Sequence, residues 1–163
     1  MLSESARMST AAELQFRVQA PNSKARATAV IALDPPSETF VRRLAEDRWN
    51  QATFLKAPAG NPAGEHGWLT TLDDRRTRIA DEVRAADQVI MVASAGGHAP
   101  AAEVIGRACS LERVTTTALI IEAAEATDDE ISKTLAQLRP WSLMVVIAST
   151  DDYVADMMTA LRV

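Results

Sequence analysis

The stretch Gln88–Ala101, QVIMVASAGGHAPA, combines an apolar run, a turn with two glycines and a proline that opens an amphipathic segment. Its first six residues are apolar at nearly consecutive positions and rich in β-branched side chains, as a strand buried on both faces must be. Pro100 suits the first turn of a helix, because that turn needs no hydrogen-bonded amide at its start. The stretch therefore predicts a buried strand, a tight connection and a helix.

Other runs along the chain have the same character as the one at Gln88. They lie at 27–33, 116–121 and 142–148, with 52–55 as a weaker fifth candidate. Upstream, Leu14, Phe16 and Val18 alternate with polar residues, which predicts a half-exposed edge strand. A turn at 21–24 would fold that strand back beside the one at 27–33.

Helical patterns separate these runs. Ser37 is expected to cap a helix over 38–49, and Thr127 opens a capping box before a helix that carries Ile131, Leu135 and Leu138. The remaining predicted helices are one with a stripe of Leu72, Arg76, Ile79, Ala80 and Val83, one after Pro100 with Val104, Ile105 and Ala108, and a last one with Val154, Met157, Met158 and Leu161.

Strands that alternate with helices predict right-handed parallel βαβ units. The expected fold is a three-layer α/β/α sandwich around a mainly parallel central sheet of five or six strands, either Rossmann-like or flavodoxin-like. Residues 1–163 are expected to form a single domain, with 1–12 as a loosely held lead-in. The Gly- and Pro-rich stretch 57–71 exceeds the usual loop length and is interpreted as a lid or a loose surface loop.

Composition excludes several classes of function. The 163 residues are 47% hydrophobic and 24% charged, with a net charge of −5 and no basic cluster, so neither a nucleic-acid nor a membrane partner is expected. No segment has signal-peptide or membrane-spanning character. The single cysteine, Cys109, cannot form an internal disulfide and is expected to be a core residue, which favours a cytoplasmic location.

Ligands of open parallel sheets bind outside the carboxyl ends of the strands. This rule predicts that the side chains after four of the predicted strands lie at one edge of the sheet, among them Glu122 and the segment 149–152. His66 would reach this edge only from the long loop. A loop-to-helix junction with glycines also offers free amides to an anion, although such a junction more often serves as a plain connection. The expected ligand-binding residues are Asp34, Ser37, Ser94, Ala95, Gly96, Gly97 and His98.

No metal and no cofactor is expected. Asp34, Asp151 and Asp152 are carboxylates that could hold a cation, but aspartates in loops before helices usually serve as caps. Neither His66 nor His98 has a histidine or cysteine neighbour at the spacing of metal ligands.

The segment QVIMVASAGGHAPAAEVIGRA resembles the strand, nucleophile elbow and helix of α/β-hydrolases, and SLMVVIASTDDYV resembles their acid segment. This resemblance implies a minimal α/β-hydrolase-like fold with Ser94 as nucleophile and the Ala95 N–H in the oxyanion hole. It also implies Asp151 or Asp152 as the orienting acid. Val92 replaces the first glycine of the family motif. No histidine follows Asp152, so the base would be His66 or His98.

A second segment, RRTRIADEVRAADQVIMVASAGGHAPAAEVIGRA, is similar to the phosphate-loop region of tubulin-like GTPases. It has Gly96-Gly97 and Ala99-Pro100 but not the intervening glycines and threonines. Pro35 and Pro36 fall where that family has its first glycine-rich loop, and prolines lack the N–H groups that a phosphate needs. The resemblance therefore implies the fold rather than GTP binding.

Three functions follow, in order of preference. The first is a non-catalytic α/β domain that binds a small ligand or a protein partner, with its pocket over 94–100. The second is a serine hydrolase that uses Ser94, and the third is a structural or assembly subunit. A small anionic or ester-like ligand, a protein partner and a homo-oligomer are all compatible with the sequence.

Overall fold

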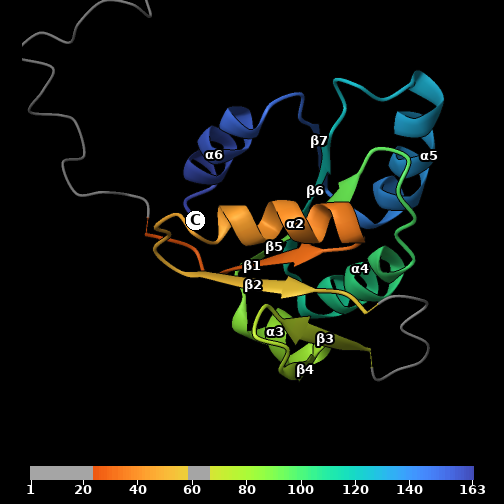
Figure 1. Ribbon diagram of the computed structural model, residues 1–163. Coiled ribbons are helices and arrows are strands. Elements are labelled where there is room, and N and C mark those ends of the chain that lie inside the picture. The colour runs from red at the N-terminus through yellow and green to blue at the C-terminus, as the bar shows by residue number, and fades with distance from the viewer. Residues whose placement is uncertain (1–23, 59–66) are drawn as a thin grey trace, which may run out of the picture.

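A computed structural model describes residues 24–58 and 67–163. In this part of the chain seven strands form one sheet in the order β4-β3-β2-β1-β5-β6-β7 (Figure 1). The strands are β1 (Thr28–Ala32), β2 (Ala52–Lys56), β3 (Trp68–Thr71), β4 (Arg76–Arg78), β5 (Gln88–Ser94), β6 (Thr115–Ile121) and β7 (Met144–Ile147). The helices are α2 (Pro35–Leu44), α3 (Ile79–Ala85), α4 (Ala101–Glu112), α5 (Asp128–Leu138) and α6 (Asp151–Ala160), with a 3-10 turn, η2, at Arg139–Trp141.

The predicted parallel core is confirmed. Strands β2, β1, β5, β6 and β7 are parallel neighbours, and they correspond to the five apolar runs of the sequence. Every side chain of β1 and β5 is buried, as expected for strands covered on both faces. The sheet has seven strands rather than five or six, because β3 and β4 add an antiparallel extension.

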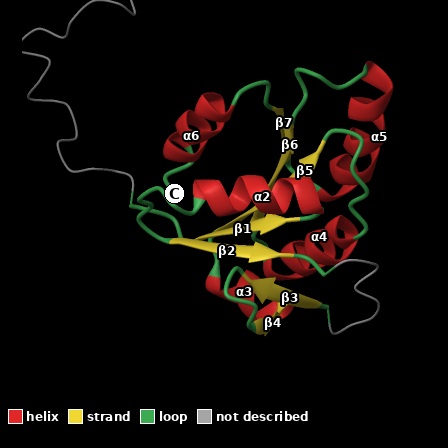
Figure 2. Ribbon diagram, viewed as in Figure 1, coloured by secondary structure: helices red, strands yellow, loops and turns green. Residues whose placement is uncertain are grey.

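Helices cover both faces of the sheet, which makes the fold a three-layer α/β sandwich (Figure 2). Helices α3, α4 and α5 pack on one face, where Met91 and Ile105 lie in the same apolar cluster. Helices α2 and α6 pack on the other face, where Val92 and Phe40 belong to a second cluster. Alternate residues of each central strand thus serve two separate cores. Cys109 is buried in the first core, as expected.

The predicted helical stripe from Leu72 to Val83 is wrong over its first half. Residues 68–78 form the β3–β4 hairpin, and a helix begins only at Ile79. Asp74 takes the left-handed conformation (φ 62°) in the turn, where the Thr71 N–H donates to the Arg75 carbonyl at 2.8 Å. The open edge of β2 accepts β3, so tertiary pairing overrides a helical spacing that arose by coincidence.

The first helix differs in its bounds from the prediction. It begins at Pro35 and ends at Leu44, and its N-cap is Asp34 rather than Ser37. Ser37 is the third helical residue and completes a capping box with Asp34. Two prolines in the first turn are tolerated because the amides there have no helical partner.

Two other helices, α4 and α5, begin where the sequence predicts. Helix α4 follows Pro100, and Thr127 forms the predicted capping box at the start of α5. Gly96 has φ 79°, so one of the two junction glycines uses the left-handed region, as predicted. The strand predicted at 142–148 forms as β7, but it differs from the expected buried strand, because Met144 is 40% and Ile147 45% exposed at the sheet edge.

The predicted edge strand at 14–18 lies outside the described residues. In the described part of the chain, β1 is paired on its two sides with β2 and β5.

Candidate functional site at the carboxyl edge of the sheet

The carboxyl ends of the parallel strands, here called the carboxyl edge, bring Asp34, Ser37 and Ser94 together. The strand order changes direction between β1 and β5, which is the position where open α/β sheets commonly hold ligands. In this protein the carboxylate of Asp34, which follows β1, links the end of β1 to the end of β5 at this position. Asp34 Oδ2 accepts hydrogen bonds from the Ser94 hydroxyl at 2.8 Å and from the Ser94 N–H at 2.9 Å, and its Oδ1 accepts from the Ser37 N–H at 2.9 Å.

The N–H and the hydroxyl of Ser94 are both hydrogen-bonded to the Asp34 carboxylate. Only 3% of the residue is exposed, and its hydroxyl donates to a carboxylate rather than to an imidazole. His98 is exposed and forms no hydrogen bond with Ser94, whereas His66 lies outside the described residues. Asp151 starts α6 and forms an ion pair with Arg43 at 3.1 Å. Neither Asp151 nor Asp152 is hydrogen-bonded to Ser94 in the described part of the chain.

The amides of the 94–99 junction are already used inside the protein. Ala95 N–H, which the hydrolase resemblance places in an oxyanion hole, donates to the Ile121 carbonyl at 3.0 Å. The Gly96 N–H donates to Thr134 Oγ1 at 2.9 Å, and the Gly97 N–H donates to the Ser94 carbonyl at 2.9 Å. An anion would have to replace these bonds, so the junction geometry is that of a structural connection.

Gly97 is required by close approach rather than by backbone conformation. A Cβ at this position would collide with Asp34 Oδ2 and would lie 2.8 Å from Ser94 Oγ. The glycine therefore leaves room for the carboxylate bridge between β1 and β5.

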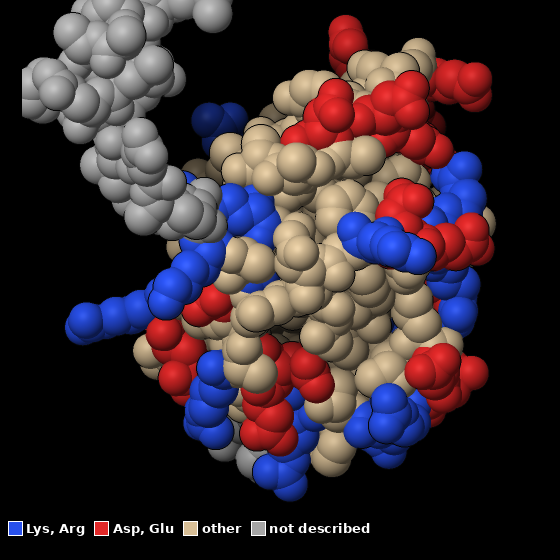
Figure 3. Space-filling model, turned by 90° about the vertical axis from the view of Figure 1, so that its left-hand side faces the viewer, with Lys and Arg blue, Asp and Glu red and all other residues tan. Residues whose placement is uncertain are grey.

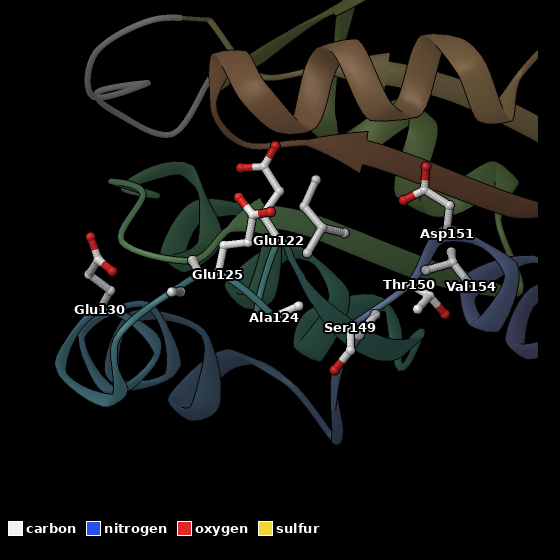
Figure 4. Close-up of a pocket in the computed structure, with 12 residues that line it drawn as sticks. Glu122, Ala124, Glu125, Glu130, Ser149, Thr150, Asp151 and Val154 are labelled. Carbon is white, nitrogen blue, oxygen red and sulfur yellow. The ribbon is translucent and has the colours of Figure 1, made fainter.

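A cavity of about 520 Å³ opens beside this bridge, at the carboxyl ends of β5, β6 and β7 (Figure 4). Apolar side chains, among them Ile121, Ala148 and Val154, contribute to its lining, and Ser149 and Thr150 add hydroxyl groups. Of the predicted ligand-binding stretch 94–98, only Ala95 lines the cavity. The pocket is thus displaced from the predicted site toward β6 and β7.

Four carboxylates and no basic side chain line the cavity within the described residues: Glu122, Glu125, Glu130 and Asp151. Figure 4 shows Glu122 and Glu125 between Glu130 on one side and Asp151 on the other. Acidic side chains also gather at the upper end of the face shown in Figure 3, the end at which α5, α6 and β7 lie in Figure 1. The pocket therefore disfavours the anionic ligand that the sequence left open.

Two of these glutamates have a distinctive local structure. Glu122 directly follows β6 and has the left-handed conformation (φ 59°), which costs free energy for a residue with a Cβ and is concentrated at functional sites. Glu130 accepts hydrogen bonds from the N–H and the hydroxyl of Thr127. These two bonds lower the pKa of Glu130, so its carboxylate stays ionised to a lower pH than that of an ordinary glutamate.

Sequence reasoning placed Glu122, Ser149 and Thr150 at strand ends but missed Glu125 and interpreted Glu130 only as a capping residue. The available signal was the acidic connection Glu122–Glu130, EAAEATDDE, after a buried strand. Only the fold shows that this loop faces the segment after β7 across a cavity.

Comparison with known protein families and with curated protein sequences finds no match to this chain. Among the described residues, no cluster of three or more histidine, cysteine or acidic side chains has the geometry to hold a metal ion. None of the helices described is both long and apolar enough to cross a bilayer.

Proposed function

We propose that this protein is a ligand-binding α/β domain whose pocket is the acidic cavity at the carboxyl ends of β5, β6 and β7. The proposal rests on one observation: a cavity of about 520 Å³, the size of many small-molecule sites, lies at the edge where parallel sheets bind ligands. A concave site in which apolar side chains lie beside carboxylates and hydroxyl groups fits a small polar ligand better than a polymer.

The charge of the pocket determines the class of ligand. Four carboxylates line the pocket, and although Asp151 pairs with Arg43 outside the lining, the remaining acidic charge favours a ligand that carries an ammonium or guanidinium group. Such a group would lie near Glu122 and Glu125, while the apolar part of the ligand would contact Ile121 and Val154. The proposed ligand is therefore a small organic cation.

The serine hydrolase has less support. It needs an accessible Ser94 next to a base, whereas the Ser94 hydroxyl is nearly buried and donates to Asp34. A hydrolase would be labelled at Ser94 by a fluorophosphonate probe, and the ligand-binding domain would not.

A screen of fluorinated small molecules by ligand-observed 19F NMR tests the proposal. The library pairs each primary amine with its carboxylic acid and its neutral alcohol of similar size. We expect amines to bind and the matched acids not to bind. Affinity is expected to fall as salt rises, because salt screens the attraction between partly exposed charges. Each such charge pair contributes roughly 0.2–1 kcal/mol.

The double variant Glu122→Gln/Glu125→Gln should weaken amine binding by roughly three- to tenfold, since about 1.4 kcal/mol corresponds to a factor of ten. Glu46→Gln is the matched control, because Glu46 is exposed and does not line the cavity. Equal binding of amines and acids, or an equal loss in the Glu46→Gln control, would contradict the proposal.

A further inference from the structure

A second cavity lies at the amino ends of β6 and β7, opposite the acidic pocket. It has a volume of about 760 Å³ and opens between these strand ends, the end of α4 and the η2 turn. None of the described residues lines both cavities. Small-molecule sites commonly have volumes of about 300–1,000 Å³, so the second cavity is large enough to be a site of its own.

The two most exposed large apolar side chains of the described chain are both found at this cavity. Leu111 is 85% exposed and Leu143 81%, and each of them lines it. Trp141, which packs against the first core, also lines the cavity. Exposed apolar side chains that gather at one concave site are typical of a surface that a ligand covers. The cavity therefore offers an apolar wall to a bound molecule.

The charge of this lining is opposite to that of the acidic pocket. Arg107 and Arg113 line the cavity, and none of its lining residues in the described chain carries a carboxylate. Arg107 forms an ion pair with Glu103 at 2.8 Å, which compensates much of its charge. Its guanidinium group also lies 5.1 Å from the centre of the Trp141 ring. Arg107 therefore contributes to the wall of the cavity more than to its net charge.

Arg113 supplies the uncompensated positive charge. It is exposed and forms no ion pair within the described residues, while Glu112 beside it in the sequence pairs with Arg84 at 2.9 Å. The partial negative charge at the end of α4 would oppose an anion. The Arg113 N–H donates to the carbonyls of Cys109 and Ser110, which reduces this opposition. The guanidinium group of Arg113 is thus available to an anionic ligand.

We propose that this second cavity binds an organic anion with a large apolar body, such as a multi-ring or long-chain acid. The acidic group would pair with Arg113, and the exposed Ser110 adds a hydroxyl donor. The apolar body would cover Leu111, Leu143 and the Trp141 ring. Charge complementarity selects an anion, and the apolar wall selects a large one, because binding is driven by the apolar area removed from water. A small acid covers only part of this wall, so the small acids of the amine screen gain little here.

Fluorescence titration of the full chain with anilinonaphthalene sulfonate tests the proposal. Its neutral counterpart is N-phenylnaphthylamine, which has the same rings and lacks the sulfonate. We expect the sulfonate to bind saturably, and to bind Arg113→Gln about two- to fivefold more weakly than wild type, whereas the neutral probe should bind both equally. Leu111→Ser should weaken both probes by about threefold or more, because it removes an apolar contact that they share. Arg75→Gln is the matched control, since Arg75 is exposed in the β3–β4 turn and does not line the cavity.

Far-UV circular dichroism and thermal melting establish that each variant is folded, because the sulfonate also binds partly unfolded protein. Absence of saturable sulfonate binding would overturn the proposal, and so would a loss in Arg113→Gln no greater than that in Arg75→Gln. An equal loss of both probes in Arg113→Gln, or no loss of either in Leu111→Ser, would also overturn it. Glu122→Gln/Glu125→Gln should not weaken sulfonate binding, and Arg113→Gln should leave amine binding unchanged, so each proposal fails or stands separately.

Discussion

At the scale of single residues, Asp34 has the most partners at the carboxyl edge. Its carboxylate caps α2 through the Ser37 N–H and holds the end of β5 through both the N–H and the hydroxyl of Ser94. One side chain thus joins a helix start to two central strands. The same arrangement explains why Gly97 stands opposite and why the Ser94 hydroxyl is engaged within the protein.

Replacement of Asp34 by alanine should lower the free energy of unfolding by about 2–4 kcal/mol. The change removes an N-cap, which is worth roughly 0.5–2 kcal/mol, and leaves buried donors of Ser94 without a partner, at about 1–3 kcal/mol. Ser94→Ala removes one of these hydrogen bonds and should cost only about 1 kcal/mol. Urea denaturation measures both values. Asp47→Ala, an exposed position after α2, is the control, and an Asp34→Ala variant as stable as that control would refute the bridge.

At the scale of elements, the contact between α4 and the η2 turn depends on a glycine in mid-helix. A Cβ on Gly106 would lie 2.5 Å from the Cβ of Trp141, so only glycine lets the helix approach the turn this closely. Arg107 on the same helix lies 5.1 Å from the centre of the Trp141 ring and covers the contact from outside. This packing fixes the segment that leads from α5 into β7.

Gly106→Ala therefore tests the packing of α4 against η2. In an isolated helix the change would be stabilising by about 1 kcal/mol. Here the clash with Trp141 should reverse the sign and destabilise the protein by about 1–3 kcal/mol, as overpacking usually does. Thermal unfolding of Gly106→Ala, with and without Trp141→Ala, separates the two effects. If Gly106→Ala alone raises the melting temperature, the close approach is not a constraint in solution.

At the scale of the whole molecule, an ion-pair network ties three distant elements together. Lys56 at the end of β2 contacts Glu38 of α2 at 3.1 Å and Asp74 of the β3–β4 turn at 2.9 Å. Burial alone would raise the pKa of Glu38, but hydrogen bonds from Arg42 and Lys56 outweigh it and lower the pKa below 4.5. The hydrogen bond from Lys56 likewise lowers the pKa of Asp74 below 3.8, and its bonds to Asp74 and Glu38 raise the pKa of Lys56 above 10.5.

The network predicts a defined dependence of stability on pH. Carboxylates with a lowered folded pKa contribute stability above their unfolded pKa and lose it as the pH falls through the folded value. Lys56→Met should therefore destabilise the protein at pH 7, and its difference from wild type should shrink as the pH falls from 5 to 3. At the alkaline end, the Lys56 contribution is complete below pH 10.5 and declines above it. A difference between wild type and Lys56→Met that is constant from pH 3 to pH 7, measured by urea denaturation, would contradict this account.

Local chemistry in the sequence determined the parallel core, the capping box at Thr127 and the start of α4 after Pro100. Continuous apolar runs and capping residues act over a few positions, so these features need no knowledge of the rest of the chain. The β3–β4 hairpin was not accessible in this way, because Leu72, Arg76, Ile79 and Val83 have helical spacing and only the open edge of β2 decides in favour of strands.

The candidate pocket depended even more on tertiary structure. Glu122, Glu125, Glu130 and Asp151 are up to 29 positions apart, and only the order of β6 and β7 in the sheet places them around one cavity. Tertiary structure also decided the role of Ser94: the sequence places it at a strand end, but the neighbouring position of β1 supplies the Asp34 carboxylate that engages its hydroxyl.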